Sequence, residues 1–198
     1  YLFDNGLVKD KNITIETLSG VKELQLYTFN GKVSSVSVDM GKAVLDGKSI
    51  PSTLEGETVV GRKISIGGQD YTVTLVNVGN PHCVVFCDKV DAVDVANVGP
   101  MFEYAEYFPQ RINAEFVRVV NDKTLKMRVW ERGNGETLAC GTGAAASVVA
   151  AVLNGYCKQD EDITVKVRGG DLIVRYSSDG SVRLTGSVKQ VFEGTVEY

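Results

Sequence analysis

A glycine-rich loop that contains a cysteine is the segment of this sequence best suited to chemistry. It spans residues 131–143, ERGNGETLACGTG, and an alanine-rich apolar segment follows it. The pattern predicts a loop entering a buried helix, whose free N–H groups and positive end would bind a carboxylate or phosphate. Cys140 would lie just before the first helical turn, where a thiolate is stabilised and the thiol pKa falls. A thiolate there could remove a proton next to a carboxylate.

Two simpler interpretations of this loop stay open. Cys140 could be one more small buried residue, since buried free cysteine is common. The glycines could have no role beyond forming a turn. The loop also differs from a P-loop, because no Gly-Lys-Ser/Thr sequence ends it. Nucleotide binding by that route is therefore not expected.

A second loop, residues 79–83 (GNPHC), contains the one histidine of the sequence. His82 follows an Asn-Pro turn and could bind a substrate or assist acid–base chemistry, or it could be a loop histidine with structural partners. Cys83 is a rival nucleophile, which its strand position disfavours because no helix dipole acts there. A third polar cluster, residues 111–115, is explained better as an ordinary turn before a strand.

Composition excludes several classes of protein. The 198 residues contain 21 Lys and Arg against 25 Asp and Glu, so no basic surface for nucleic acid is expected. The hydrophobic share of 43% and charged share of 23% are typical of a soluble globular protein. The longest apolar run, residues 144–153, is too short to cross a membrane, and no signal peptide opens the chain. One histidine and four cysteines without zinc spacing predict no metal site, reduced thiols and a cytoplasmic location.

Strands and one enclosed helix would position the two loops. Apolar and polar residues alternate with period two in several β-branched segments, which predicts half-buried strands. The clearest are residues 13–15, 36–38, 71–75, 125–129 and 163–167. Residues 142–153 are apolar on nearly every face, which predicts an enclosed helix that ends at Asn154-Gly155.

The chain contains an internal repeat. Residues 5–33 and 154–182 share the order Asn-Gly, strand, glycine turn, strand, hairpin and strand, which predicts two similar domains with strands around a central helix. In the second copy 14 residues lead from Cys140 to Asn154, and the same distance before Asn5 passes the chain start. Because the sequence also begins with tyrosine, we expect a fragment of a longer protein, with residues 1–3 ending a helix.

Four motifs resemble the diaminopimelate epimerase family and follow that family's order. They are GNPHC at residues 79–83, RINA at 111–114, ERGNGETLACGTGA at 131–144 and LTG at 184–186. The resemblance covers essentially the whole chain and implies an α+β fold of two pseudo-symmetric β-barrel domains, each closed around a central helix. Residues 1–42 with 184–198 would be an incomplete first domain, and residues 43–183 the second.

The resemblance also implies an activity. The family interconverts LL- and meso-diaminopimelate without a cofactor, by proton transfer at the α-carbon between a cysteine thiolate and a cysteine thiol, in lysine and peptidoglycan precursor biosynthesis. Cys140 matches one cysteine, and Glu131 and His82 match groups that assist. The substrate-binding positions it implies are Asn80, Asn113, Arg132 and the backbone of Gly141 and Thr142. The expected partner is this small molecule, with no nucleic acid or membrane.

The family's other cysteine lies in an N-terminal Ala-Cys-Gly-Asn-Gly motif that is missing here, so we expect this chain alone to be inactive or nearly so. Exposed strand edges in residues 1–42 could pair two copies into a homodimer. Two alternatives stay open: a related cofactor-independent racemase or isomerase with another substrate, and a non-catalytic ligand-binding fragment. The set Asn80, Asn113 and Arg132 favours a substrate with a second amino-acid centre, and the intact 131–140 loop favours a catalytic parent.

Overall fold

The computed structural model describes residues 1–18, 20–47 and 49–197. Its strands are β1 (Asn12–Thr17), β2 (Gly20–Phe29), β3 (Lys32–Lys42), β4 (Arg62–Ile66), β5 (Gln69–Asn77), β6 (Pro81–Phe86), β7 (Asn113–Asn121), β8 (Thr124–Glu131), β9 (Gly135–Glu136), β10 (Asp162–Val167), β11 (Gly170–Tyr176) and β12 (Ser181–Ser187). Its helices are α1 (Val95–Glu103) and α2 (Gly141–Leu153), with a short 3-10 turn at Val90–Ala92.

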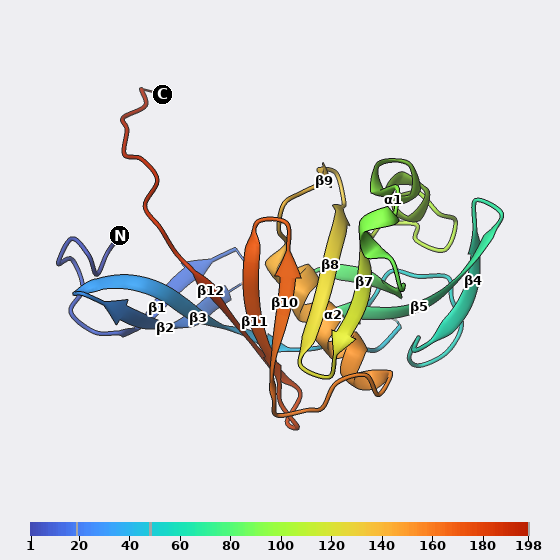
Figure 1. Ribbon diagram of the computed structural model, residues 1–198, viewed down its shortest axis with the longest axis horizontal. Coiled ribbons are helices and arrows are strands. Elements are labelled where there is room, and N and C mark those ends of the chain that lie inside the picture. The colour runs from blue at the N-terminus through green and yellow to red at the C-terminus, as the bar shows by residue number, and fades with distance from the viewer. Residues whose placement is uncertain (19, 48, 198) are drawn as a thin grey trace.

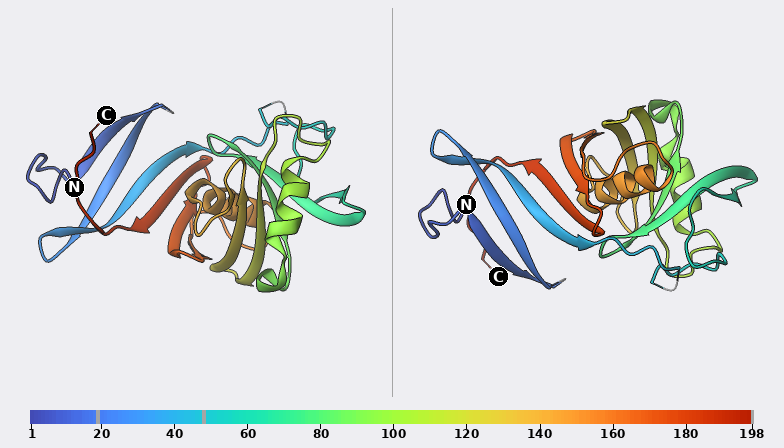
Figure 2. Two further views of the ribbon diagram at one scale, coloured as in Figure 1. Left: turned by 90° about the horizontal axis from the view of Figure 1, so that it is seen from above. Right: turned by 90° about the horizontal axis from the view of Figure 1, so that it is seen from below.

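One mixed sheet joins nearly all of these strands. Their order is β1-β2-β3-β12-β11-β10-β8-β7-β6-β5-β4, and β9 pairs with β8. Neighbours are antiparallel except β6 with β7 and β8 with β10, which are parallel. The part of the sheet from β12 to β5 curves around α2, while β1–β3 extend to one side (Figures 1 and 2).

The predicted closed barrel is only partly matched. Helix α2 contacts strands of the sheet from β5 to β12, so it is enclosed as expected. Between β3 and β5, however, the link is one isolated antiparallel pairing of Val44 with Asn77 rather than a ladder. Within the described part of the chain the strand path ends at β1 and β4, which do not pair with each other. The α+β architecture is thus confirmed, and barrel closure stays a prediction.

The strands and the buried helix predicted from sequence periodicity are confirmed, but the expectation of a single helix is wrong, since α1 is a second one. The five segments predicted as strands lie in β1, β3, β5, β8 and β10, and the predicted helix is α2. Every α2 residue from Gly143 to Ala151 is buried, since small side chains let the surrounding strands approach on all sides. The helix is capped at its end by Asn154. Residues 1–6 form a turn in which the Asn5 N–H donates to the Tyr1 carbonyl and Gly6 has φ 70°, as at a helix end.

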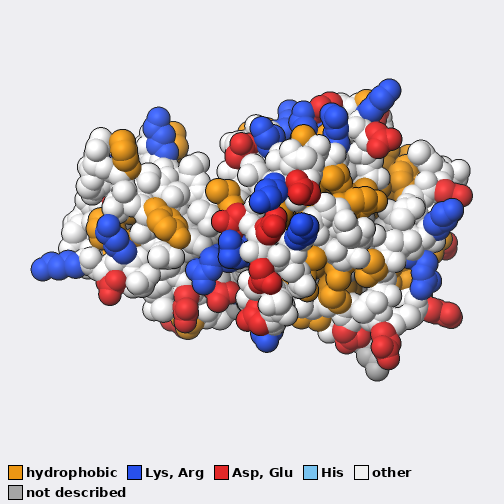
Figure 3. Space-filling view, turned by 60° about the horizontal axis from the view of Figure 1, so that its bottom comes forward, with side chains coloured by type: hydrophobic (Ala, Val, Ile, Leu, Met, Phe, Trp, Pro, Cys, Tyr) orange, Lys and Arg blue, Asp and Glu red, His pale blue; other side chains and the backbone are white. Residues whose placement is uncertain are grey.

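Two apolar clusters support the fold. One surrounds α2, and the second lies under α1, where Phe102, Phe108 and Phe116 are fully buried. Among the described residues of the β1–β3 extension, Leu26 is buried but belongs to neither cluster, and large apolar side chains such as Phe29 are exposed. Basic and acidic side chains are interspersed on the face drawn in Figure 3. In the part of the chain that is described, no helix is both long and apolar enough to cross a membrane.

Candidate active site

Cys140 lies at the N-terminus of α2, as the sequence predicts. Its backbone is extended (φ −133°, ψ 114°), and its Sγ accepts a hydrogen bond of 3.3 Å from the Gly143 N–H. A thiol in the cap position thus satisfies one of the N–H groups that the first turn leaves free. The Thr142 hydroxyl lies 3.4 Å from the same sulfur. Only 7% of Cys140 is exposed.

The prediction of a lowered thiol pKa is wrong. The pKa of Cys140 is raised from 9.0 to about 11, mainly by burial and to a smaller extent by the negative charges of Glu115 and Glu131. The bonds from Thr142 and from the Gly143 N–H lower this pKa but are outweighed. The physical reason is that loss of water penalises the thiolate more than the helix start stabilises it. In this structure Cys140 is therefore a protonated thiol at neutral pH.

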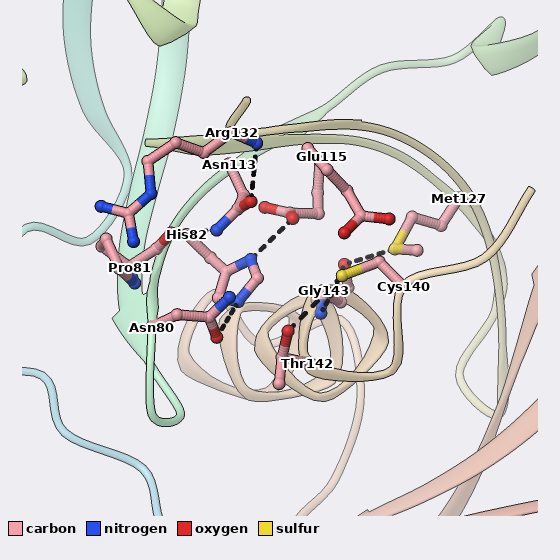
Figure 4. Close-up of polar contacts among 12 residues, drawn as sticks. Asn80, Pro81, His82, Asn113, Glu115, Met127, Arg132, Cys140, Thr142 and Gly143 are labelled. Carbon is pink, nitrogen blue, oxygen red and sulfur yellow. Dashed lines mark hydrogen bonds and ion pairs between the residues drawn. The ribbon is translucent and has the colours of Figure 1, made fainter. Parts of the chain in front are cut away.

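His82 lies inside strand β6 rather than in a loop, which corrects the sequence interpretation. It is fully buried, and each of its ring nitrogens has a partner. Nδ1 lies 2.7 Å from Glu115 Oε1, and Nε2 lies 2.9 Å from Asn80 Oδ1 (Figure 4). The parallel pairing of β6 with β7 sets His82 opposite Asn113, so that Glu115, two residues further along β7, reaches the ring.

Glu115 is the main residue that sequence reasoning missed. It is fully buried in β7, and one of its oxygens, Oε2, has no hydrogen-bond partner among the described residues. Burial raises the pKa of this carboxyl, and the neighbouring His82 opposes that rise. The sequence does contain a signal for Glu115, since it is a carboxylate within the otherwise apolar residues 114–117. A charge buried without a partner is costly, so such a residue implies a polar partner nearby.

The rival Cys83 is also fully buried in β6. Burial raises its pKa well above the ordinary value, and Glu115 adds to the effect. All four cysteines are free, as expected from the sequence. In the described ranges no group of three or more His, Cys, Asp or Glu side chains could hold a metal ion.

Asn113 links the three predicted motifs. Its Nδ2 donates to the Pro81 carbonyl over 2.8 Å, and its Oδ1 accepts from the Arg132 N–H over 2.9 Å. The polar cluster at residues 111–115 is therefore more than an ordinary strand start. The Arg132 side chain is exposed and donates to the Gln110 carbonyl over 3.1 Å. The guanidinium is accordingly within reach of an incoming anion.

A second buried carboxylate supports the loop after β8. Glu103, 2% exposed at the end of α1, accepts from Trp130 Nε1 over 2.7 Å and from the Gly133 N–H over 3.0 Å. Arg111 lies 3.5 Å from the same carboxylate. In the loop itself, the Thr137 hydroxyl donates to Glu131. Sequence reasoning also missed Glu103, because its partners come from a distant part of the chain.

The chain is similar to known proteins that share one description. A family model described as diaminopimelate epimerase matches residues 74–191. The diaminopimelate epimerase of Geobacillus sp. (strain WCH70) is 43% identical over 199 residues, covering 100% of this chain and 70% of that protein. That of Acetivibrio thermocellus is 46% identical over 198 residues, covering 100% of this chain and 70% of that protein. This chain belongs to the diaminopimelate epimerase family. The predicted resemblance is confirmed, and the family is one of isomerases.

Solved structures share the fold at much lower identity. A probable proline racemase from Agrobacterium radiobacter K84 matches with a TM-score of 0.68 and 14% identity, covering 94% of this chain and 61% of that one. A hydroxyproline epimerase from Agrobacterium vitis matches with a TM-score of 0.66 and 13% identity, covering 94% of this chain and 60% of that one. At this identity the likeness concerns the fold alone. The match to this member of the diaminopimelate epimerase family covers about 60% of the length of each of those two chains.

Proposed function

We propose that this chain supplies the Cys140 half of an epimerase that interconverts LL- and meso-diaminopimelate without a cofactor, in lysine and peptidoglycan precursor biosynthesis. The observation that supports this most is the position of Cys140 as the cap of α2. The Gly143 N–H donates a hydrogen bond to its sulfur, and the Thr142 hydroxyl is hydrogen-bonded to the same atom. A proton donor there faces the free N–H groups of a helix start, which suit the substrate's α-carboxylate. The proposed function includes a cytoplasmic location.

In the proposed reaction Cys140 acts as the acid for one substrate face. Its thiol gives a proton to the α-carbon, and the electron pair left on that carbon by deprotonation forms the new C–H bond. A second cysteine on the opposite face removes the original proton; the family carries it in an Ala-Cys-Gly-Asn-Gly motif that this sequence does not contain. The raised pKa of Cys140 keeps the thiol protonated at neutral pH, which is the form that this step needs. Preorganised N–H groups of Gly141 and Thr142 would stabilise the carbanion.

We assign the remaining polar groups to assistance and substrate binding. Glu131 and His82 assist the proton transfer, since Glu131 acts electrostatically on Cys140 and His82 lies beside Glu115. Asn80 and Asn113 hold the polar groups of the substrate, and the exposed Arg132 can pair with a distal carboxylate. The proposed domains are residues 1–42 with 184–198 and residues 43–183; positions 19, 48 and 198 lie outside the described residues.

The test uses this chain alone and an extended version that begins with the N-terminal residues of the Geobacillus relative. Each is incubated with LL-diaminopimelate in D2O, and its intact mass is checked against 21.4 kDa for the chain alone. We expect deuterium incorporation and meso product only with the extended version. Cys140→Ala in that version should abolish both, while the matched variant Cys87→Ala should keep them.

The outcomes separate the alternatives. Meso product from the 21.4 kDa chain alone would show that the second-cysteine account is wrong, and Cys83, Cys87 and Cys157 would then be tested as its replacement. Activity of the extended Cys140→Ala variant would overturn the role of Cys140. Exchange of proline but not of diaminopimelate would favour a racemase with another substrate. Binding without exchange would favour a ligand-binding fragment, and a doubled mass in solution would support the homodimer.

A further inference from the structure

The carboxylate of Glu103 joins the segment before β7 to the loop after β8. Its Oε2 accepts from Trp130 Nε1 over 2.7 Å, and its Oε1 accepts from the Gly133 N–H over 3.0 Å. The same Oε1 lies 3.5 Å from Arg111 Nη1. An indole N–H, a backbone N–H and a guanidinium can only donate, so the roles in these three contacts are fixed. Because Glu103 is 2% exposed, water does not readily replace any of them.

Helix α1 packs on Trp130 in a way that fixes the position of this carboxylate. Gly99 and Glu103 are four residues apart in α1, so they lie on the same face of the helix. The indole ring occupies the space beside Gly99, where a built Cβ would lie 2.4 Å from the ring's Cγ. The helix thus contacts the indole closely at one turn and accepts a hydrogen bond from its N–H at the next. Two separate contacts therefore set where Glu103 lies relative to β8.

The groups that Glu103 binds are the chain neighbours of the atoms that place Arg132. Gly133 follows Arg132 directly and has φ 81°, in the left-handed region that glycine adopts easily. The Arg132 guanidinium donates to the carbonyl of Gln110, the residue before Arg111. One carboxylate therefore holds both the backbone next to Arg132 and the segment whose carbonyl its side chain binds.

Arg111 has a backbone conformation that needs support from its surroundings. Its φ of 62° lies in the left-handed region, which few residues other than glycine adopt. Its guanidinium lies 4.6 Å from the centre of the Tyr104 ring and 3.5 Å from the Glu103 carboxylate. A conformation of this kind persists where packed neighbours hold it. Without the carboxylate, the exposed Tyr104 ring would be the remaining support among the described residues, and the segment with Gln110 would be free to relax.

From these contacts we propose that Glu103 is a positioning residue, which fixes Arg132 and thereby sets the affinity of the site for the distal, carboxylate-bearing end of the substrate. This inference rests on the proposed function and deepens it, because Arg132 is the group assigned to that carboxylate. Asn113 holds the Arg132 N–H independently, over 2.9 Å (Figure 4). Loss of Glu103 should therefore shift the guanidinium without displacing Cys140, which is held by the start of α2. Substrate binding, rather than proton transfer, should depend on Glu103.

The first test needs no substrate. Hydrogen exchange of the Gly133 N–H and of the Trp130 indole N–H is followed by ¹⁵N NMR in the purified chain, in Glu103→Gln and in the exposed control Glu106→Gln. A glutamine has one acceptor oxygen, so we expect exchange of at least one of the two groups to speed up about tenfold in Glu103→Gln. The amides of α2 should stay protected, which shows that the chain remains folded. Unchanged exchange of both groups would overturn the proposal.

The second test measures turnover of LL-diaminopimelate by the extended version of the chain. We expect Glu103→Gln to raise KM about tenfold and to change kcat less than about threefold, because a charge-assisted hydrogen bond to the substrate is weakened. In an Arg132→Ala background the same substitution should change KM little, since its effect passes through the guanidinium. Glu106→Gln should keep both constants. Arg111→Ala removes an exposed side chain, so it tests the same link even if Glu103→Gln fails to fold, and it should also raise KM only while Arg132 is present.

The outcomes distinguish this inference from the proposed function. A fall in kcat with KM unchanged would overturn the positioning role, because Glu103 would then act on the chemical step. An equal rise in KM with and without Arg132 would also overturn it, because the effect would not pass through that residue. An extended chain without any deuterium exchange at the substrate would instead contradict the proposed function. The exchange rates of the Gly133 and Trp130 N–H groups would then still decide whether Glu103 holds the loop.

Discussion

The carboxylate of Glu115 occupies the space that a side chain at position 143 would fill. A Cβ on Gly143 would lie 2.8 Å from Glu115 Oε1, closer than real Cβ atoms approach a neighbour. Glu115 comes from β7 and Gly143 from the first turn of α2, so the absence of a side chain on the helix allows the strand's carboxylate to approach. The glycine-rich motif before the helix therefore has a packing function in addition to any anion binding.

Gly143→Ala is expected to destabilise the chain by about 1–3 kcal/mol, because an added methyl group in a filled space must displace its neighbours. The groups to be displaced are the buried Glu115 carboxylate and the Cys140 side chain. Urea unfolding followed by circular dichroism measures the change. The matched control is Gly141→Ala, whose new methyl would meet only the flexible end of Leu184, at 2.9 Å. Equal stability of the two alanine variants would contradict the packing argument.

Cys140 is expected to react slowly with iodoacetamide at pH 8. Its pKa is raised by burial from 9.0 to about 11, which lowers the thiolate fraction at pH 8 about 100-fold below that of the unfolded chain. The rate should rise with pH until about 11, as peptide mass spectrometry can follow at each cysteine. The same chain in urea is the control and should react with a midpoint near 9. Fast alkylation of Cys140 in the folded chain at pH 7 would contradict the raised pKa and would support the lowered pKa expected for a thiol at a helix start.

Glu103→Gln is expected to loosen the loop that follows β8. A glutamine has one acceptor oxygen, so either Trp130 Nε1 or the Gly133 N–H loses its buried partner. The expected cost is about 1–3 kcal/mol. Because Trp130 is the one tryptophan in the sequence, its fluorescence during urea unfolding reports this site directly. Glu106→Gln, an exposed carboxylate three residues later, should change neither stability nor emission.

Stability is expected to fall in acid partly through Glu136. Its carboxylate accepts from Arg128 Nε over 2.8 Å and from Nη2 over 3.1 Å, and these bonds hold the pKa of Glu136 below its ordinary value of 4.5. A lowered folded-state pKa contributes stability above pH 4.5 that is lost as pH falls through the folded-state value. Glu136→Gln should therefore cost about 1.5–3 kcal/mol at pH 7 and much less near pH 3.

Urea midpoints at pH 7 and pH 3 measure this difference for the unmodified chain and the variant. The control is Asp171→Asn, which removes an exposed carboxylate and should shift the two midpoints little. A gap between Glu136→Gln and the unmodified chain that stays constant from pH 7 to pH 3 would contradict the electrostatic origin of the effect.

The sequence by itself determined many of the strands, the buried helix α2 and the position of the cysteine. Alternation of apolar residues predicted strands such as β5 and β10, because side chains of a strand alternate between two faces. Alanines on every side of residues 142–153 predicted an enclosed helix, and the glycines before it placed Cys140 at the cap. These features depend on neighbours along the chain, which is why one sequence is enough to predict them.

Only the tertiary structure decided the chemical state of the site. His82 and Glu115 are 33 residues apart, and they meet because β6 and β7 pair in parallel. The thiol pKa of Cys140 depends on how much water the surrounding strands remove and on carboxylates from β7 and β8. The isolated bridge between Val44, just after β3, and Asn77 of β5 could not be predicted from the sequence either. Desolvation and long-range charge are properties of packed neighbours, and local sequence spacing does not encode them.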